Sequence, residues 1–280
     1  MTVEFNFNAI DPGNSLLNEF LCDCRNYSLD EYNQARNFSH SNLITLLNLN
    51  IRSYSANGPP FHGFIGSLEE SPNFVIVTET WNSDTTAKLC HMTGYVGHHT
   101  YRTLSREGGV SIFVKDAGYT VTKCDDLSYV TDDIETCVVQ VRLTGSDSIL
   151  IFGFYRPPSG SAERFVENIE HLLEACDHPN FSLIMLAGDA NIAINSSSTI
   201  SNYYMSCLQS FGFVSAIDKP TRFPSNISSD TQASCLDHIF FNKLTYYASG
   251  VISLDISDHC PTFLKLPTDL CIPKKPNLMV

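Results

Sequence analysis

Short apolar runs recur along the chain from Leu43 onward, separated by clusters of Gly, Pro, Asn and Asp. β-Branched and aromatic residues dominate these runs, which is typical of strands. Several runs are apolar on both faces, as strands in the interior of stacked sheets are. We therefore predict strands at Leu43–Leu49, Phe74–Val77, Gly109–Val114, Cys137–Leu143, Ser148–Phe154, Ser182–Ala187, Ile239–Phe241, Val251–Leu254 and Thr262–Leu266.

Two segments between these runs place their apolar residues at helical spacing instead. Ser161–Cys176 has one apolar stripe and begins at Ser161, a residue type that caps helix N-termini well. Ser201–Phe211 shows the same spacing and stops at Gly212, which favours the left-handed conformation that ends many helices. Strands with interspersed helices predict an α/β fold.

The ends of the chain differ in character from the segment between them. Residues 1–40 are polar with little periodicity, and we predict a loosely ordered extension or a short appended helix. Residues 269–280 carry two prolines around a lysine pair and are predicted to be a tail or linker. Residues 41–268 show no internal repeat and are long enough to bury a large core, so they are predicted to form one domain.

Composition narrows the class of protein further. The 280 residues are 43% hydrophobic and 17% charged, which is ordinary for a globular protein. No apolar run of about 18 residues exists, and the N-terminus lacks the basic and apolar regions of a secretory signal. We therefore expect no membrane association and an intracellular protein that is not secreted. The ten cysteines show no framework spacing, which predicts free thiols.

The net charge of −13 disfavours a protein that coats nucleic acid through a basic face. It still allows an enzyme that contacts a few phosphates through a local site and a divalent metal, because clustered carboxylates are what a magnesium site requires.

Polar residues with chemical capacity stand where several predicted strands begin or end. A core strand holds its end residue rigidly at the rim of a sheet, where α/β enzymes place their sites. One such residue is unremarkable, but carboxylates, amides, a hydroxyl and an imidazole together can hold a hard cation, bind a phosphate and move a proton. The set comprises Asn50, Glu79, Tyr155, Asp189, Asn191, Asp237, Asp258 and His259.

The motifs that contain these residues occur in a familiar order: LNLN-IRS, TETW, GGVSIFV, GFYRPP, GDAN, CLDHIF and SDHCP. Over about residues 43–266 the chain resembles the endonuclease/exonuclease/phosphatase superfamily. It is most similar to the abasic-endonuclease-like domain that opens the polymerase polyprotein of LINE-type retrotransposons. The resemblance implies a deoxyribonuclease-I-like fold, a four-layered sandwich of two mixed β-sheets flanked by helices.

The resemblance also implies roles for individual residues. His259 would contact the scissile phosphate and either stabilise the transition state or handle a proton, with Asp237 as the carboxylate that fixes its tautomer. Asp189 would orient or deprotonate the attacking water. Asn191 would donate to a phosphate oxygen or hold Asp189. The alternative for the Asp189 segment is an Asx-type turn.

A metal site follows from the same resemblance. Glu79 would be the principal Mg²⁺ ligand, with Asp258 or Asn50 beside it, and Mn²⁺ is the alternative cation. Mg²⁺ takes only one or two protein carboxylates and keeps several waters, so this set suffices. Tyr155 would donate to the phosphate.

Three further residues are assigned to substrate binding. The guanidinium of Arg52 suits a DNA phosphate, although a solvated charge is an equal alternative. Thr221 matches a threonine that abuts the site in the related retrotransposon domains, and Ser257 would tie the His259 loop together. The polar segment 222–236 is predicted to be a hairpin loop that contacts a DNA groove.

The resulting hypothesis is a magnesium-dependent DNA endonuclease. It would be a monomer of the nucleus and cytoplasm, either standalone or part of a longer reverse-transcriptase polyprotein, and its nick would leave a 3′-hydroxyl that primes reverse transcription. The net acidity favours a first alternative, a superfamily enzyme acting on RNA, a phosphoinositide or another phosphoester. The second alternative is an inactive mobile-element remnant that only binds, which the intact polar set disfavours.

Overall fold

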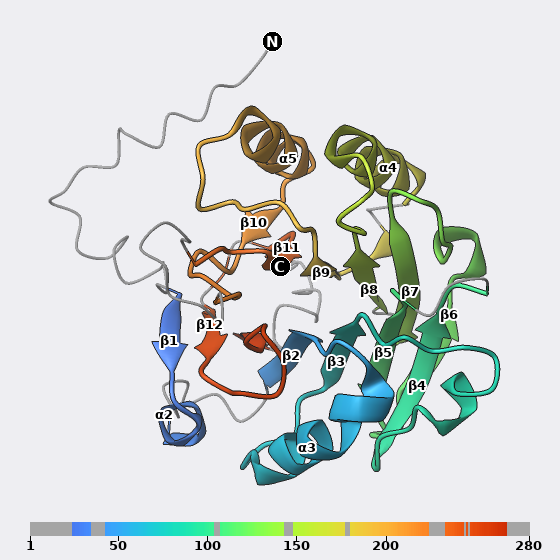
Figure 1. The fold of residues 1–280 in the computed structure, drawn as a ribbon, viewed down its shortest axis with the longest axis vertical. Helices are drawn as coiled ribbons and strands as arrows, with labels where there is room; N and C mark the ends of the chain where they lie inside the picture. Colours follow the sequence, from blue (N-terminus) through green and yellow to red (C-terminus); the bar gives the residue numbers. More distant parts are fainter. Residues whose placement is uncertain are drawn as a thin grey trace, which may run out of the picture.

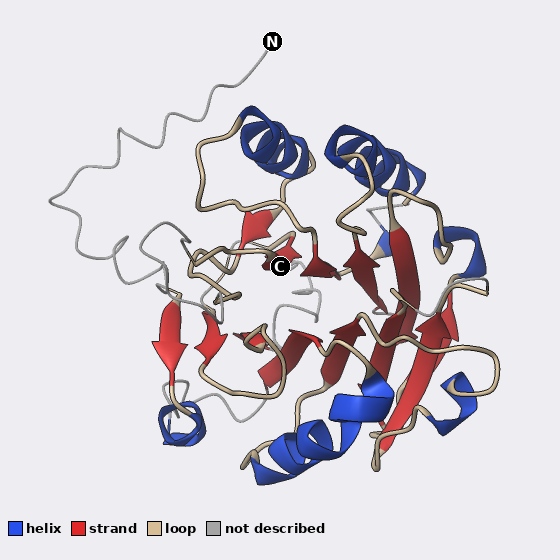
Figure 2. Cartoon of the chain, viewed as in Figure 1, coloured by secondary structure: helices blue, strands red, loops and turns tan. Residues whose placement is uncertain are grey.

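Two mixed β-sheets stack face to face, and helices cover their two outer faces (Figures 1 and 2). The computed structural model describes residues 24–34, 43–103, 107–142, 148–176, 180–223, 233–243, 245 and 247–267. The expected four-layered sandwich of two mixed sheets flanked by helices is confirmed. The predicted tail at 269–280 and most of the predicted loop at 222–236 lie outside the described residues.

The first sheet has seven strands in the order β1-β12-β13-β2-β3-β5-β4. Strands β2 and β3 run parallel at its centre, and β13 and β5 flank them antiparallel. The strand bounds are β1 Arg25–Tyr27, β2 Leu43–Asn50, β3 Phe74–Thr78, β4 Tyr95–Thr100, β5 Val110–Lys115, β12 Ala248–Ile252 and β13 Thr262–Pro267.

The second sheet has six strands in the order β10-β11-β9-β8-β7-β6. Its central strands β8 and β9 are parallel, and β7 and β11 pair with them antiparallel. The strand bounds are β6 Thr120–Lys123, β7 Glu135–Arg142, β8 Ser148–Tyr155, β9 Leu183–Asp189, β10 Val214–Ser215 and β11 Asp237–Phe241.

Three apolar clusters correspond to the three interfaces between the layers. Residues from both sheets, such as Ile76 and Ile151, fill the space between the sheets. The second cluster packs α4 (Ala162–Ala175) and α5 (Thr199–Ser210) on the six-stranded sheet. The third packs α2 (Leu29–Gln34) and α3 (Tyr54–Ser67) on the seven-stranded sheet. Short 3₁₀ turns, η2 at Ala87–Leu89 and η3 at Asp125–Leu127, complete the described elements.

Every predicted strand has an observed counterpart, and the two predicted helices correspond to α4 and α5. Helix α3 was missed because its sequence, YSANGPPFHGFIGS, contains glycines and an internal Pro59–Pro60 pair. Such residues disfavour a helix interior. Burial of Tyr54, Phe61 and Phe64 against the sheet outweighs that preference.

The described part of the N-terminal segment is built into the fold. Strand β1 pairs in parallel with β12, and Tyr27 meets the ring of Phe263 edge-on with centroids 5.1 Å apart. Among the described residues no helix is long and apolar enough to cross a membrane. The eight described cysteines are all free, as predicted for them.

Candidate active site

The topology brings the polar strand ends to one rim of the sandwich. In the first sheet, β2 and β3 are parallel with Asn50 opposite Thr78, so the residues that follow them emerge together. In the second sheet, Tyr155 lies opposite Asp189 at the ends of β8 and β9. Strand β11 is antiparallel to β9, so its first residue, Asp237, also lies opposite Asp189.

Side chains from the two sheets meet at this rim through Asn50 and Tyr155. The buried Asn50 donates from Nδ2 to Glu79 Oε1 of its own sheet and to Asp189 Oδ2 of the other, at 2.8 Å in both cases. Tyr155 reaches across in the opposite direction and donates to Glu79 Oε1 at 3.1 Å. The expected residues from separate segments are therefore in direct contact.

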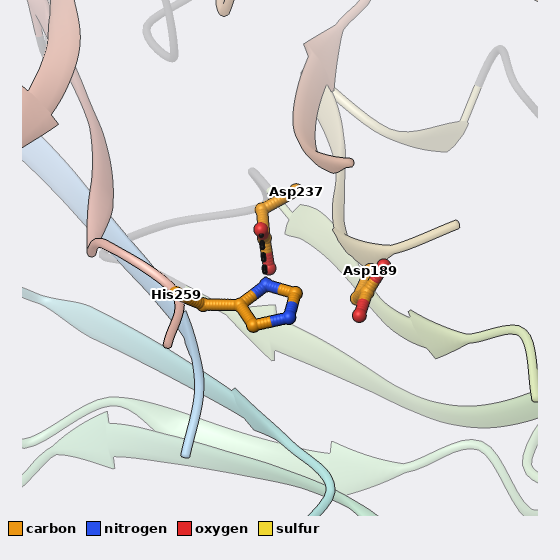
Figure 3. Close-up of side chains that lie close together, drawn as sticks. All are labelled: Asp189, Asp237 and His259. Atoms are coloured by element: carbon orange, nitrogen blue, oxygen red, sulfur yellow. Dashed lines mark hydrogen bonds and ion pairs between the residues drawn. The ribbon is translucent and has the colours of Figure 1, made fainter. Parts of the chain in front are cut away.

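A histidine–carboxylate pair forms a further link between the sheets (Figure 3). His259 precedes β13 of the first sheet, and its Nδ1 lies 2.7 Å from Oδ2 of Asp237 in the second sheet. Both residues are buried. Burial alone would lower the pKa of His259, but the charges of Asp237, Asp189 and Asp258 and the hydrogen bond that Nδ1 donates to Asp237 together raise its pKa to about 9. The imidazole is therefore held as a cation near neutral pH.

Thr221 supports the pair from behind. Its hydroxyl donates to Asp237 Oδ2 at 2.6 Å and accepts from the backbone N–H groups of Leu236 and Asp237 at 3.1 Å each. The Thr221 side chain is fully buried, so its hydroxyl contacts Asp237 and not solvent. Asp237 Oδ2 therefore receives two hydrogen bonds, which fixes the carboxylate toward His259.

Asp189 lies beside this pair and is fully buried (Figure 3). Potential ligand atoms of Asp189, Asp237 and His259 lie within 4.8 Å of one another. Burial and the charge of Asp237 raise the pKa of Asp189, while His259 and the hydrogen bonds from Asn50 and Asn191 act against that rise. A carboxylate with a raised pKa beside a cationic imidazole is suited to accept a proton near neutral pH.

The turn after β9 is held by Arg156, a residue that the sequence did not single out. Asn191 takes a left-handed φ of 48°, and its backbone N–H donates to Asp189 Oδ1 at 2.8 Å. Its side-chain amide donates to the carbonyl of Arg156 at 2.8 Å. The buried guanidinium donates to the carbonyls of Ala190, Asn191 and Gly160 at 2.6 to 2.7 Å. This network fixes the conformation that presents Asp189.

Glu79 is held in a left-handed conformation, with φ 50°, by the segment that follows it. The backbone N–H groups of Thr80 and Trp81 donate to the carbonyls of Gly109 and Gly108, at 3.3 and 2.8 Å. Gly109 is in turn bound by Glu135 through its backbone N–H.

Glu135 begins β7 and is fully buried. Its carboxylate accepts from the backbone N–H of Gly109 and from Nε of Arg102. A Cβ at Gly108 would lie 2.2 Å from the Glu135 carboxylate, so this position requires glycine. Glu135 thus supports the turn that presents Glu79. No local pattern could have revealed this role, because the glycines are distant in the sequence.

The donor set at the rim fits a hard divalent cation. The hydrogen bonds from Asn50 and Tyr155 both end on Oε1 of Glu79, which leaves Oε2 for a cation. Oδ1 of Asp258 is buried and has no hydrogen-bond partner among the described residues. Oxygen ligands of this kind suit Mg²⁺ or Mn²⁺ rather than a soft metal.

Asp258 binds two arginines through its other oxygen. Arg52 Nη1 lies 3.0 Å from Oδ2, and Nε and Nη2 of Arg222 lie at 3.0 Å from the same atom. Burial would raise the pKa of Asp258, but His259 and the two guanidinium groups lower it below its ordinary value. Ser257 joins this loop to the rim by donating to the carbonyl of Asn50 at 2.6 Å and accepting from the N–H of His259 at 3.1 Å.

Buried carboxylates, a buried amide and a cationic imidazole at the junction of two sheets are groups that hydrolysis of a phosphoester can use. The chain belongs to the Endonuclease/Exonuclease/phosphatase family, which matches residues 35–259. This confirms the resemblance drawn from the motifs. No curated protein sequence matches the chain.

Solved structures with the same fold include the endonuclease domain of a retrotransposon and an AP endonuclease. The endonuclease domain of TRAS1, a telomere-specific non-LTR retrotransposon, aligns with a TM-score of 0.62 and 16% identity, over 80% of this chain and 98% of that one. The AP endonuclease LMAP from Leishmania major aligns with a TM-score of 0.65 and 14% identity, over 93% of this chain and 96% of that one. D. rerio TDP2 complexed with single-strand DNA product aligns with a TM-score of 0.57 and 11% identity, over 80% of this chain and 99% of that one. At these identities the alignments show the fold alone, and they bear out the deoxyribonuclease-I-like architecture.

Proposed function

We propose that this protein is a magnesium-dependent DNA endonuclease that hydrolyses one phosphodiester bond and leaves a 3′-hydroxyl. The observation that carries the proposal is the set of contacts across the two sheets, in which Asn50 bridges Glu79 and Asp189 while His259 pairs with Asp237. These residues supply a metal ligand, a base and a cationic group in one cluster, as hydrolysis of a phosphodiester requires.

In the proposed reaction, Asp189 accepts a proton from the attacking water, whose oxygen forms the new bond to phosphorus. The bond from phosphorus to the 3′-oxygen breaks, and that oxygen takes up a proton from solvent. The raised pKa of Asp189 suits this role, because a base works best with a pKa near the operating pH. The Asn191 N–H holds the carboxylate in place at 2.8 Å.

The protonated His259 balances the negative charge that grows on the phosphate oxygens. Asp237 keeps the imidazole charged and oriented, and Tyr155 supplies a hydroxyl whose pKa is raised by burial and by Glu79, so it stays a donor. A divalent cation on Glu79, with Asp258 and Asn50 near it, would supply further neutralisation of that charge.

Nicking of supercoiled plasmid tests the proposal directly. We expect the wild-type protein to nick in Mg²⁺ and to be inactive with EDTA. Glu79→Ala, Asp189→Ala and His259→Ala should each lose activity by on the order of a hundredfold or more. Glu167→Ala, on the exposed face of α4, is the matched control and should nick normally. Undiminished nicking by the three site variants would refute the proposal.

The wider context is a further part of the proposal. Motifs most similar to those of LINE-type endonuclease domains support a nick that primes reverse transcription, made by residues 41–268 acting as one domain on nuclear DNA. Ligation of a radiolabelled adaptor to the nicked product, which requires a free 3′-hydroxyl, checks the product end. A 3′-phosphate at the nick would contradict this assignment.

The net charge of −13 favours one rival, a family enzyme acting on a different phosphoester. A panel of plasmid DNA, abasic duplex, RNA and inositol phosphates separates the two functions. Turnover of inositol phosphate or RNA with no cleavage of either DNA would establish the rival.

A further inference from the structure

We propose that Arg52 and Arg222 form a phosphate-binding bracket that holds a second phosphate of the substrate strand, adjacent to the scissile one. This inference rests on the proposed nuclease function and adds to it a requirement for a chain of phosphodiesters. It assigns a binding site to Arg222, which neither the motifs nor the family match point to.

The bracket is built on one carboxylate oxygen. Oδ2 of Asp258 accepts from Nη1 of Arg52 and from Nε and Nη2 of Arg222, all at 3.0 Å. Two positive charges on one negative charge leave a local excess of one positive charge. That excess lies beside a site otherwise dominated by carboxylates, in a chain of net charge −13.

The backbone of Arg52 is tied to a residue of the active site. Its N–H donates to Oδ1 of Asn50 at 3.1 Å, and its carbonyl accepts from the side-chain amide of Asn57 at 3.1 Å. These contacts hold Arg52 in a left-handed conformation with φ 46°. A non-glycine residue in that region is strained, and such strain collects at binding sites and active sites.

The backbone of Arg222 is tied to the catalytic histidine. Arg222 forms antiparallel β-bridges with Ser234 and with His259, and Cys260, the residue after His259, donates its N–H to the carbonyl of Thr221 at 2.7 Å. Arg222 follows Thr221, which binds Asp237. Both guanidinium groups are therefore carried by backbone that is fixed to the residues proposed to act on the scissile phosphate.

Both side chains remain open to a ligand. They are 48% and 45% exposed, while Asp258 is only 23% exposed. A guanidinium has five N–H donors, and the contacts with Asp258 use one nitrogen of Arg52 and two of Arg222. The donors that have no partner among the described residues suit the paired oxygens of a phosphate. Exposed ion pairs contribute little to stability, so folding alone does not explain two arginines on one carboxylate.

The placement has a consequence for substrate choice. Asp258 is the chain neighbour of His259, so the bracket lies next to the group proposed to bind the scissile phosphate. A substrate with a single phosphodiester, such as thymidine 5′-(p-nitrophenyl phosphate), would leave the bracket empty. An oligonucleotide would fill it with the next phosphate of the same strand.

Oligonucleotides in which each phosphate flanking the nick is replaced in turn by an uncharged methylphosphonate test the bracket. For the wild-type protein, we expect kcat/KM to fall about tenfold or more at one flanking position. Arg52→Ala and Arg222→Ala should each lower kcat/KM on the unmodified strand to a similar extent, mainly through KM. In these variants the methylphosphonate at that position should cause little additional loss.

Three controls keep the test sharp. Hydrolysis of thymidine 5′-(p-nitrophenyl phosphate), which leaves the bracket empty, should lose several-fold less kcat/KM in both variants than cleavage of the oligonucleotide does. Arg142 is an exposed arginine at the last position of β7, at the other end of the strand from Glu135, and Arg142→Ala should behave as wild type in every assay. Arg222→Lys, which keeps the charge but not the paired donors, should recover only part of the affinity, and it serves if an alanine variant folds poorly.

The outcomes distinguish failure of the bracket from failure of the proposed nuclease function. If the wild-type protein cleaves DNA but tolerates a methylphosphonate at every flanking position, the bracket is refuted and the nuclease assignment stands. Equal sensitivity of wild type and both arginine variants to the methylphosphonate would also refute it. If no DNA substrate is cleaved at all, the proposed function fails and the bracket fails with it.

Discussion

Replacing Asp237 with asparagine keeps the shape of the side chain but removes the charge that faces His259. An asparagine can still accept a hydrogen bond from Nδ1 of His259 and from the Thr221 hydroxyl through its amide oxygen. The imidazole would then still be buried, which lowers its pKa, but it would no longer face the negative charge of Asp237, which raises it. We expect the pKa of His259 to fall from about 9 toward its ordinary value of about 6.5.

The size of the effect follows from that difference. One pKa unit corresponds to about 1.36 kcal/mol, so a fall of up to about 2.5 units removes at most about 3 kcal/mol of interaction with the charged imidazole. Because the pKa of His259 in the folded protein is raised, its stabilisation is fully present below the unfolded value of about 6.5 and is lost as pH rises through about 9. Asp237→Asn should therefore lower the free energy of unfolding much more at pH 6 than at pH 10.

Two measurements on the metal-free protein check this reasoning. NMR titration of the histidine ring nitrogens gives the pKa of His259 in wild type and variant, and urea unfolding at pH 6 and pH 10 gives the two free-energy differences. Asp116→Asn, at an exposed position in the turn after β5, is the matched control and should leave both unchanged. A His259 pKa in Asp237→Asn within about half a unit of the wild-type value would refute the reasoning.

Three further perturbations address other parts of the molecule. Glu135→Gln should lower the free energy of unfolding by about 3 kcal/mol in urea, because it leaves the charge of Arg102 without a buried partner, and should slow nicking by loosening the Glu79 turn. Burial lowers the pKa of His238 to about 4, so wild-type stability should fall as pH drops from about 6.5 to 4, and unfolding of His238→Phe should show a smaller fall. Gly188→Ala should prevent stable folding, seen as a lost cooperative thermal transition, because its Cβ would lie 1.8 Å from a backbone oxygen of β8.

The core strands were predictable because their composition is strongly biased. Strands such as β8 and β9 are buried along their whole length, so every position is apolar or small and the pattern is unambiguous. The edge strand β4 was missed because it is half-exposed and reads YVGHHT. Helix α3 was missed because its stability comes from burial of its aromatic residues and not from helix propensity.

The candidate site also contains residues that could be predicted from the sequence and residues that could not. Asn50, Glu79, Asp189 and His259 could be picked out because each is a chemically capable residue next to an apolar run. Glu135 could not, because its contacts with Gly109 and Arg102 depend on the alignment of β5 with β7 across the two sheets.

The sequence by itself determined the fold class, the strand ends that carry polar groups, and the family, because apolar periodicity and motif order are local properties of the chain. The tertiary structure alone decided that Asn50 joins the two sheets, that Thr221 lies behind Asp237, and that two arginines share Asp258. The physical reason is that these contacts join residues from separate strands and loops. Their geometry is set by the stacking of the sheets and the register of the strands, and no short stretch of sequence contains that information.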